Sequence, residues 1–317
     1  MLLPSLSRLT PTAADADADA ELASIHGQRR QRARRRFFQA VLEDDDRGVS
    51  EGIEAGARLN QVDAAGETAL TVAARLGFAR VVRILLDAGA NTDTRRAPLF
   101  ATALYWAVMR GWTEIALLLI EKGANVSITT AERDSPLVAA SRLGRTDVAR
   151  ALIQQGARLN TVDQFGGTPL LYASEGGRRR IVEALLSARA NVDLANEDDG
   201  RTPLIAAVEE GHRRIVNMLL EAGASRSAVN KDGETATDIA RREGRNEIVA
   251  LSKSSGKPWT TSASSCENGA SLNVLGVPWY SPVNSPSAFL YSFVAQYWLR
   301  WQVSVKAASS APLSPSG

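Results

Sequence analysis

One period of 33 or 34 residues runs through most of this 317-residue chain and limits what the chain can fold into. Each copy starts at a Ser or Thr, continues with two residues that are usually apolar, and carries a Gly nine residues later. The six starting residues are Thr68, Thr102, Ser135, Thr168, Thr202 and Thr235. Such a period predicts a row of similar units, each sharing its apolar core with its neighbours, instead of one closed domain.

The residue type at each position predicts the structure of one unit. Thr168 is a good N-cap and Pro169 suits the first position of a helix. Gly177 then ends that helix in a left-handed conformation, and Leu185 belongs to the apolar face of a second helix. A tight turn at Asp163 precedes the cap. Each unit is therefore expected to be a helix–turn–helix with a protruding hairpin.

Residues 163–173 and 200–212 lie close to the pattern Asp-x-x-Gly-x-Thr-Pro-Leu-His-x-Ala-Ala, followed by Gly-His. In these residues the chain resembles the ankyrin repeat family. Residues 35–251 hold about seven such repeats, of which the first is degenerate and places Phe37, Phe38 and Val41 on its first helix. The resemblance implies an all-α solenoid of helix–turn–helix units with β-hairpin fingers.

Two repeats depart from the pattern. Arg189 occupies the position where the other repeats carry the Gly of Gly-Ala, and a non-Gly residue in left-handed geometry costs on the order of 1–2 kcal/mol. The third repeat has Ala97-Pro98-Leu99-Phe100 where the turn sequence is expected. We therefore expect backbone strain at Arg189 and an apolar, irregular finger in the third repeat.

The two tails differ from the repeats in composition. Residues 1–34 alternate Asp and Ala and then become arginine-rich, with six arginines in residues 29–36, and we expect them to be disordered. The arginines suit nuclear import or nucleic-acid binding, or merely a solvated entry to the first helix. Residues 252–317 are rich in Ser, Pro and aromatic residues and are expected to be mostly disordered, with a possible helix over 287–306. That helix would bind a partner or a membrane surface, or pack loosely on the repeats.

The sequence lacks the residue patterns that common catalytic sites require. The chain has two histidines, His26 and His212, and one cysteine, Cys266, which together make no standard zinc site. No phosphate-binding loop, dinucleotide fingerprint or nucleophile elbow is present. We expect no enzymatic activity, no metal and no cofactor, with His212 in a structural hydrogen bond.

Charge and cysteine content bear on location and partners. A formal net charge of +2 does not favour binding to nucleic acid or to membranes. Arg300 argues against a membrane span over residues 287–305. A single cysteine suits a reducing compartment. The expectation is a monomer in the cytoplasm, with the nucleus as a second location.

In the resembled family, a partner protein binds on the fingers and on the exposed side of each first helix. Carried over by position, this implies a concave groove that is apolar and basic in its first half and acidic in its second, with Phe165 at the junction. The predicted partner-binding residues are Arg75, Leu76, Leu99, Met109, Arg110, Arg142, Leu143, Phe165, Glu175, Asp198, Asp199, Glu209 and Glu210.

The expected function is therefore a protein-interaction scaffold or adaptor. Its partner would present an acidic or apolar segment to repeats two to four and a basic segment to repeats five and six. One alternative is a regulatory or targeting subunit whose aromatic C-terminal tail engages a membrane or a complex. Another is a nucleus-associated regulator that uses the arginines of residues 29–36.

Overall fold

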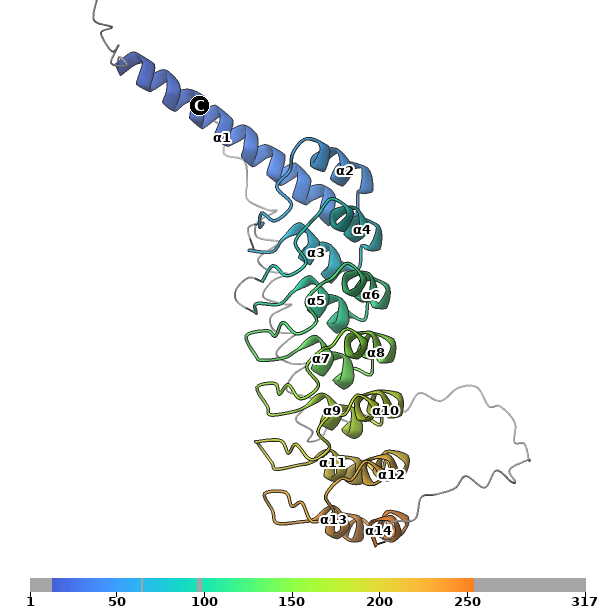
Figure 1. The fold of residues 1–317 in the computed structure, drawn as a ribbon. Helices are drawn as coiled ribbons and strands as arrows, with labels where there is room; N and C mark the ends of the chain where they lie inside the picture. Colours follow the sequence, from blue (N-terminus) through green and yellow to red (C-terminus); the bar gives the residue numbers. More distant parts are fainter. Residues whose placement is uncertain (1–12, 64, 96–98, 254–317) are drawn as a thin grey trace, which may run out of the picture. The chain divides into compact units, whose positions relative to one another are not determined.

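The computed structural model describes residues 13–253 except 64 and 96–98, and these residues form fourteen helices (Figure 1). Repeat 1 holds α1 and α2, and every later repeat holds one first helix and one second helix. The bounds are α1 Ala13–Leu42, α2 Asp46–Glu54, α3 Ala69–Leu76, α4 Ala79–Asp87, α5 Ala103–Arg110, α6 Thr113–Glu121, α7 Pro136–Arg142, α8 Thr146–Gln154, α9 Pro169–Glu175, α10 Arg179–Ser187, α11 Pro203–Glu209, α12 Arg213–Glu221, α13 Ala236–Arg242 and α14 Asn246–Lys253.

Helix boundaries follow the residues that mark the period. In repeats 2–7 the starting Ser or Thr is the N-cap of the first helix, and its side chain accepts a hydrogen bond from the N–H three residues later. The Gly nine residues after that cap is left-handed in every one of these repeats; Gly77, for example, has φ 93°. Both features were predicted from the sequence and are confirmed.

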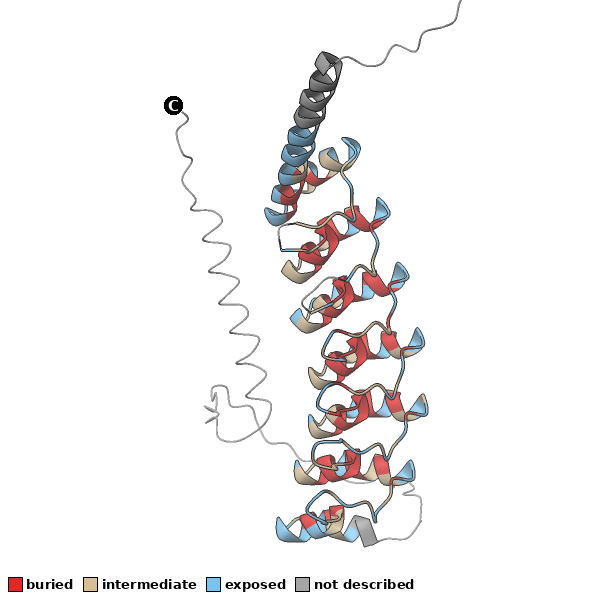
Figure 2. Cartoon of the chain, turned by 90° about the vertical axis from the view of Figure 1, so that its left-hand side faces the viewer, coloured by how far each residue is buried: buried red, intermediate tan, exposed pale blue. Residues whose placement is uncertain are grey.

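First helices pack on first helices and second helices on second helices, from α3 to α14. The contact surfaces merge into one continuous core, drawn in red in Figure 2. Small residues allow the first helices to approach closely, since Ala73, Ala74, Ala206 and Ala207 are fully buried. Each repeat thus depends on its neighbours for burial of its apolar residues.

A second contact between repeats comes from the residue that follows the helix-ending Gly. The side chain of Trp112 lies against Gly77 of the preceding repeat and donates a hydrogen bond to the carbonyl of Arg75 (3.2 Å). His212 lies in the same way against Gly177, with its Nε2 3.0 Å from the carbonyl oxygen of Glu175. The structural hydrogen bond expected of His212 is therefore present.

The fingers form fewer cross-strand hydrogen bonds than full β-hairpins do. Among the residues described, β-structure is limited to two isolated antiparallel bridges, Val62–Thr68 and Val229–Thr235. Neighbouring fingers also bond to one another, as when the N–H of Gln164 donates to the carbonyl of Glu132 (2.9 Å). The expected hairpin fingers are thus tight turns joined along the row by main-chain hydrogen bonds.

The N-terminal segment differs from the prediction of a disordered tail over residues 1–34. Helix α1 already begins at Ala13, so residues 13–34 are helical. Ala, Glu, Gln and Arg are strong helix formers. The far end of α1 is anchored because Phe37, Phe38 and Val41, which lie on this helix as predicted, are buried. The sequence analysis missed this helix because alternating Asp and Ala give the segment no apolar face.

The two departures from the repeat pattern both show an unusual backbone conformation. Arg189 has φ 64°, the left-handed conformation expected where Gly is replaced. In the irregular finger of repeat 3, Phe100 has φ 54° and is exposed.

Residues 254–317, which include the possible helix 287–306, the span 287–305 and Cys266, lie outside the described residues. No helix in the part that is described has the length and apolar character needed to cross a membrane.

Candidate interaction surface of the repeats

The predicted partner-binding residues come from two recurring positions of the first helix and from the fingers. We call the surface made by these residues, together with the residue just before each N-cap, the finger face. It comprises the residue just before each N-cap, the residues seven and eight after the cap, and the finger turns. The first helix places the residue at position seven next to the one before the cap, because two turns of helix separate them.

This geometry creates a recurring ion pair within single repeats. In repeat 2, Nη2 of Arg75 lies 2.6 Å from Oε2 of Glu67. The same two positions hold Asp134 and Arg142 in repeat 4, and Arg201 and Glu209 with reversed sign in repeat 6. Arg75 was predicted to face a partner, but it lies half-buried and is bonded to its own repeat.

Arg142 lies at the centre of a larger network that joins repeats 3, 4 and 5. Its guanidinium pairs with Asp134 and, at 3.3 Å, with Asp163 of the next repeat. Two tyrosines complete the network, because Tyr105 donates to Asp134 (3.0 Å) and Tyr172 donates to Asp163 (2.7 Å). The Arg142 guanidinium also lies 5.3 Å from the centre of the Tyr172 ring. We call these five residues the Arg142 cluster.

Burial dominates the electrostatics of the Arg142 cluster. The side chains of Asp134 and Asp163 are only 5% and 2% exposed. Burial raises the pKa of Asp134, and the ion pair with Arg142 and the hydrogen bonds from Arg142 and Tyr105 oppose that rise. Burial likewise raises the pKa of Tyr105, with the Asp134 charge adding to the effect. These groups hold one another and leave little for a partner to contact.

Arg201 organises a second and more open group of charges in repeats 5 and 6. It lies 2.9 Å from Glu175, 3.3 Å from Asp199 and 3.4 Å from Glu209. These three carboxylate side chains are 36%, 45% and 21% exposed. Burial, only partly offset by Arg201, raises the pKa of Glu209. We call Arg201 and its three acids the Arg201 cluster.

Two further acids of the finger face lie beside this cluster in the sequence. Asp198 is exposed in the finger turn, and Glu210 is exposed at the end of α11. Neither has an ion-pair partner among the described residues. Five carboxylates therefore accompany the single guanidinium of Arg201, and this part of the finger face is negatively charged.

Repeat 3 interrupts the ion pairs with apolar residues. Ala101 and Met109 occupy the paired positions there. Met109 and Leu99 are half-buried against the core, and Phe100 is 42% exposed. The guanidinium of Arg110 lies 5.9 Å from the Trp106 ring centre, and burial, followed by repulsion from Arg75, lowers the pKa of Arg110. The finger face of repeat 3 is thus apolar with one partly covered cation.

The remaining predicted residues fall into two groups. Leu76 and Leu143 are half-buried at the ends of α3 and α7, so each offers only part of its surface. Phe165 is 39% exposed in the finger turn of repeat 5, where Asp163 accepts a hydrogen bond from its N–H (3.0 Å). Asp163 therefore serves both the turn and the Arg142 cluster, and it fixes the direction of the Phe165 finger.

The sequence reasoning missed the partners of the predicted residues. Tyr105, Asp134, Asp163, Tyr172 and Arg201 were not singled out as members of ionic groups. One sequence signal was available: opposite charges recur eight residues apart at the same position of the repeat, as in Glu67 with Arg75. The contacts between repeats, such as Arg142 with Asp163, give no comparable signal at short spacing.

These groups can bind charged or apolar segments. In the part of the chain that the structure describes, no group of three His, Cys, Asp or Glu side chains is placed to hold a metal ion. The buried acids of the finger face are engaged in ion pairs, and His212 is engaged between repeats. The arrangement supports recognition of another molecule at the surface.

Comparison with known proteins agrees with the fold. The family model described as "Ankyrin repeats (3 copies)" matches residues 37–130, 104–196, 137–231 and 190–257. A solved ankyrin repeat domain from Acinetobacter baumannii AYE is 30% identical, with a TM-score of 0.57, over 60% of this chain and 98% of that one. The ankyrin repeat protein EF0377 is 31% identical, with a TM-score of 0.54, over 57% of this chain and 94% of that one.

Curated relatives match over shorter stretches. Human BCL-6 corepressor-like protein 1 is 41% identical over 73 residues, which is 23% of this chain and 4% of the relative. The chain therefore spans only a small fraction of that relative's length.

Proposed function

This chain belongs to the ankyrin repeat family, and on that premise we propose that it is a non-catalytic scaffold or adaptor that binds a partner protein on its finger face. Repeats of this family are protein-interaction modules, and the partner is a protein segment with a basic part and an apolar part. The proposal includes a monomeric chain without cofactor, located in the cytoplasm or nucleus, where a single cysteine stays reduced.

One observation carries the proposal: the excess of carboxylates around Arg201. Glu175, Asp199 and Glu209 share one guanidinium, and Asp198 and Glu210 have no ion-pair partner among the described residues. A basic segment that approached repeats 5 and 6 would gain favourable interactions without breaking the fold. Such complementarity chiefly sets association rate and register, and apolar contacts supply affinity.

The apolar part of the partner is assigned to repeat 3 and the Phe165 finger. Phe100 and Phe165 are exposed aromatic residues of the fingers, and Met109 and Leu99 belong to the same repeat as Phe100. Aromatic side chains are enriched among residues that dominate binding energy. An acidic segment at repeats 2–4 has less support, because Arg75 and Arg142 are held by carboxylates of this chain.

The test is affinity capture from cell extract with the intact chain and an Asp198→Lys, Glu210→Lys variant. Both residues are exposed, so circular dichroism and thermal midpoint should be unchanged. A matched control reverses two exposed acids of second helices, Glu121→Lys and Glu221→Lys. A protein captured by the intact chain and the control, but lost with the first variant, would support the proposal. Equal capture by all three chains would contradict the finger-face site.

The exposed arginines of α1 support a second candidate function. Arg29, Arg32, Arg35 and Arg36 are exposed on this helix. A row of guanidinium groups on a helix suits the phosphate backbone of nucleic acid, which fits a nucleus-associated regulator. Binding of duplex DNA that falls steeply with salt and is abolished by Gln at these four positions would support it. Salt-independent or undetectable binding would rule it out.

A further inference from the structure

The second helices of repeats 5 and 6 each begin with two consecutive arginines, which no other second helix among the described residues does. The first two residues of α10 are Arg179 and Arg180, and those of α12 are Arg213 and Arg214. The equivalent second residues of α6, α8 and α14 are acidic: Glu114, Asp147 and Glu247. Helices α2 and α4 have one arginine there, Arg47 and Arg80, and each is paired with an acid of this chain. The double arginines are therefore confined to two adjacent repeats, and the neighbouring repeats 4 and 7 carry an acid at the second position.

Contacts between repeats place these arginines side by side. Helix α10 packs against both α8 and α12. Arg178, just before α10, lies on Gly144 in the turn between α7 and α8, and His212, just before α12, lies on Gly177 in the turn between α9 and α10. The ends of the three helices that carry the arginines are thus adjacent. We call Arg150, Arg178, Arg179, Arg180, Arg213 and Arg214 the arginine strip.

Most of the arginine strip is available to solvent. All six side chains are exposed. Arg213 pairs with Glu247 at 2.6 Å, whereas Arg150, Arg179, Arg180 and Arg214 have no ion-pair partner among the described residues. Like charges on neighbouring helices repel one another, and an incoming anion relieves that repulsion. These arginines contrast with those of the finger face, most of which are held by acids of this chain.

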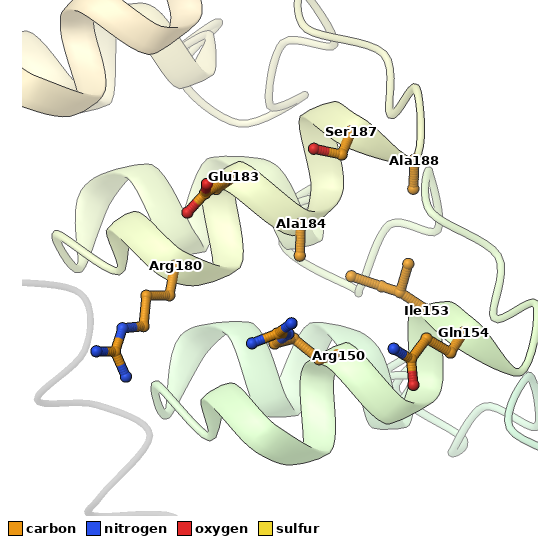
Figure 3. A pocket seen from close by; sticks show the side chains of 8 residues that line it. All are labelled: Arg150, Ile153, Gln154, Arg180, Glu183, Ala184, Ser187 and Ala188. Atoms are coloured by element: carbon orange, nitrogen blue, oxygen red, sulfur yellow. The ribbon is translucent and has the colours of Figure 1, made fainter.

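A surface depression of about 510 Å³ lies between α8 and α10, next to the strip (Figure 3). Arg150 and Arg180 lie toward one end of it, and Gln154 and Ala188 lie toward the other. Ile153 and Ala184 give it an apolar part, and Glu183 is the one carboxylate among the lining residues. The depression can receive a side chain from a segment held by the arginines.

We propose that the arginine strip and the depression between α8 and α10 form a second docking surface, which binds an acidic segment of a protein partner. Guanidinium groups bind carboxylates through paired hydrogen bonds, and every cation of the strip is an arginine. The segment's carboxylates meet Arg179, Arg180 and Arg214, and an apolar side chain of the segment enters the depression.

Three features favour an acidic protein segment over nucleic acid. The strip is short and ends at Asp147 and Glu247, which would repel a longer polyanion. The finger face of the same two repeats is itself acidic, as the Arg201 cluster shows. Ile153 and Ala184 suit an apolar side chain, which a phosphate backbone does not offer. The chain would therefore hold two different segments on two surfaces.

The experiment measures binding of a fluorescent peptide of alternating Glu-Glu-Leu units to the full chain at low ionic strength. The test variant is Arg179→Glu, Arg180→Glu, Arg214→Glu. The matched control is Arg58→Glu, Arg158→Glu, Arg226→Glu, which makes the same change of net charge outside the strip. We expect the affinity to fall at least about tenfold in the test variant and less than about twofold in the control.

Other outcomes would overturn the proposal. Equal loss in both triple variants would show non-specific attraction, and no measurable binding by the intact chain would remove the site. A single-stranded oligothymidylate of equal charge that binds more tightly, with the same dependence on the strip, would assign the surface to nucleic acid. If the test variant unfolds, Arg179→Gln with Arg214→Gln provides the same comparison without charge reversal. Asp198→Lys with Glu210→Lys should leave binding of this peptide undiminished, which separates this surface from the finger face.

Discussion

Two ionic clusters of the finger face share a plan but differ in access to solvent. In each, one arginine meets carboxylates from its own repeat and from an adjacent repeat. Arg142 and Arg201 are themselves equally covered, with side chains 20% and 21% exposed. Their partners differ, because the acids beside Arg142 are 5% and 2% exposed, whereas those beside Arg201 are 21% to 45% exposed.

Two tyrosines account for part of the difference. Tyr105 and Tyr172 donate hydrogen bonds to the acids of the Arg142 cluster and help to cover them. No tyrosine occurs in repeat 6, and the acids around Arg201 outnumber their cation. Similar ion pairs thus hold repeats 4 and 5 together, whereas at repeats 5 and 6 they leave excess negative charge that a partner can contact.

The sharpest test of this comparison is Arg142→Ala. It leaves Asp134 and Asp163 buried without their cation, and removing one partner of a buried ion pair costs about 3–5 kcal/mol. Urea unfolding followed by circular dichroism should show the loss. Arg158→Ala is the control, because Arg158 is exposed and has no ion-pair partner among the described residues, and it should change the stability by less than about 0.5 kcal/mol. A small effect of Arg142→Ala would show that the network adds little to stability.

The backbone between the two clusters provides the next test. Arg189 follows α10 with φ 64°, and Arg189→Gly removes strain of on the order of 1–2 kcal/mol. The thermal midpoint should rise. Arg189→Ala removes the charge but keeps the strained backbone, so its midpoint should stay near that of the parent chain. An unchanged or lower thermal midpoint for Arg189→Gly would contradict the explanation by backbone strain.

Tyr172→Phe tests the coverage of the Arg142 cluster with a smaller change. It deletes the 2.7 Å hydrogen bond to Asp163 but keeps the ring beneath Arg142. The expected loss is about 1 kcal/mol in the free energy of unfolding. The matched change Tyr105→Phe removes the equivalent bond to Asp134 and should cost a similar amount. Stability equal to the parent chain in both variants would mean that the hydroxyl groups contribute nothing.

Arg201→Ala should have the smallest effect on stability. The acids around Arg201 are partly solvated, and exposed pairs contribute about 0.2–1 kcal/mol, so a loss below about 1 kcal/mol is expected. The finger face would become more negative, and association with the partner identified by affinity capture should become faster at low salt. A loss as large as that of Arg142→Ala would remove the distinction between the clusters.

The sequence alone allowed most of the array to be predicted. The period gave the repeats, Thr168 and its equivalents gave the helix starts, and Gly77 and its equivalents gave the helix ends, because capping depends on residues close in the chain. The helical conformation of residues 13–34 was not predicted, since its Asp-Ala alternation lacks an apolar face. Residue positions on the finger face were predicted, whereas their ion-pair partners were not.

What the sequence by itself determined about this protein is therefore the repeat unit and the order of the units. Short-range hydrogen bonds, left-handed glycines and helical periodicity act over a few residues and can be read from the chain. Only the tertiary structure decided which charges remain for a partner. Arg142 and Arg179 are both arginines of the repeats, but stacking places Asp163, 21 residues away, beside the first and no described acid within ion-pair distance of the second. Burial and pairing depend on neighbouring repeats, and these contacts exist only after the repeats have stacked.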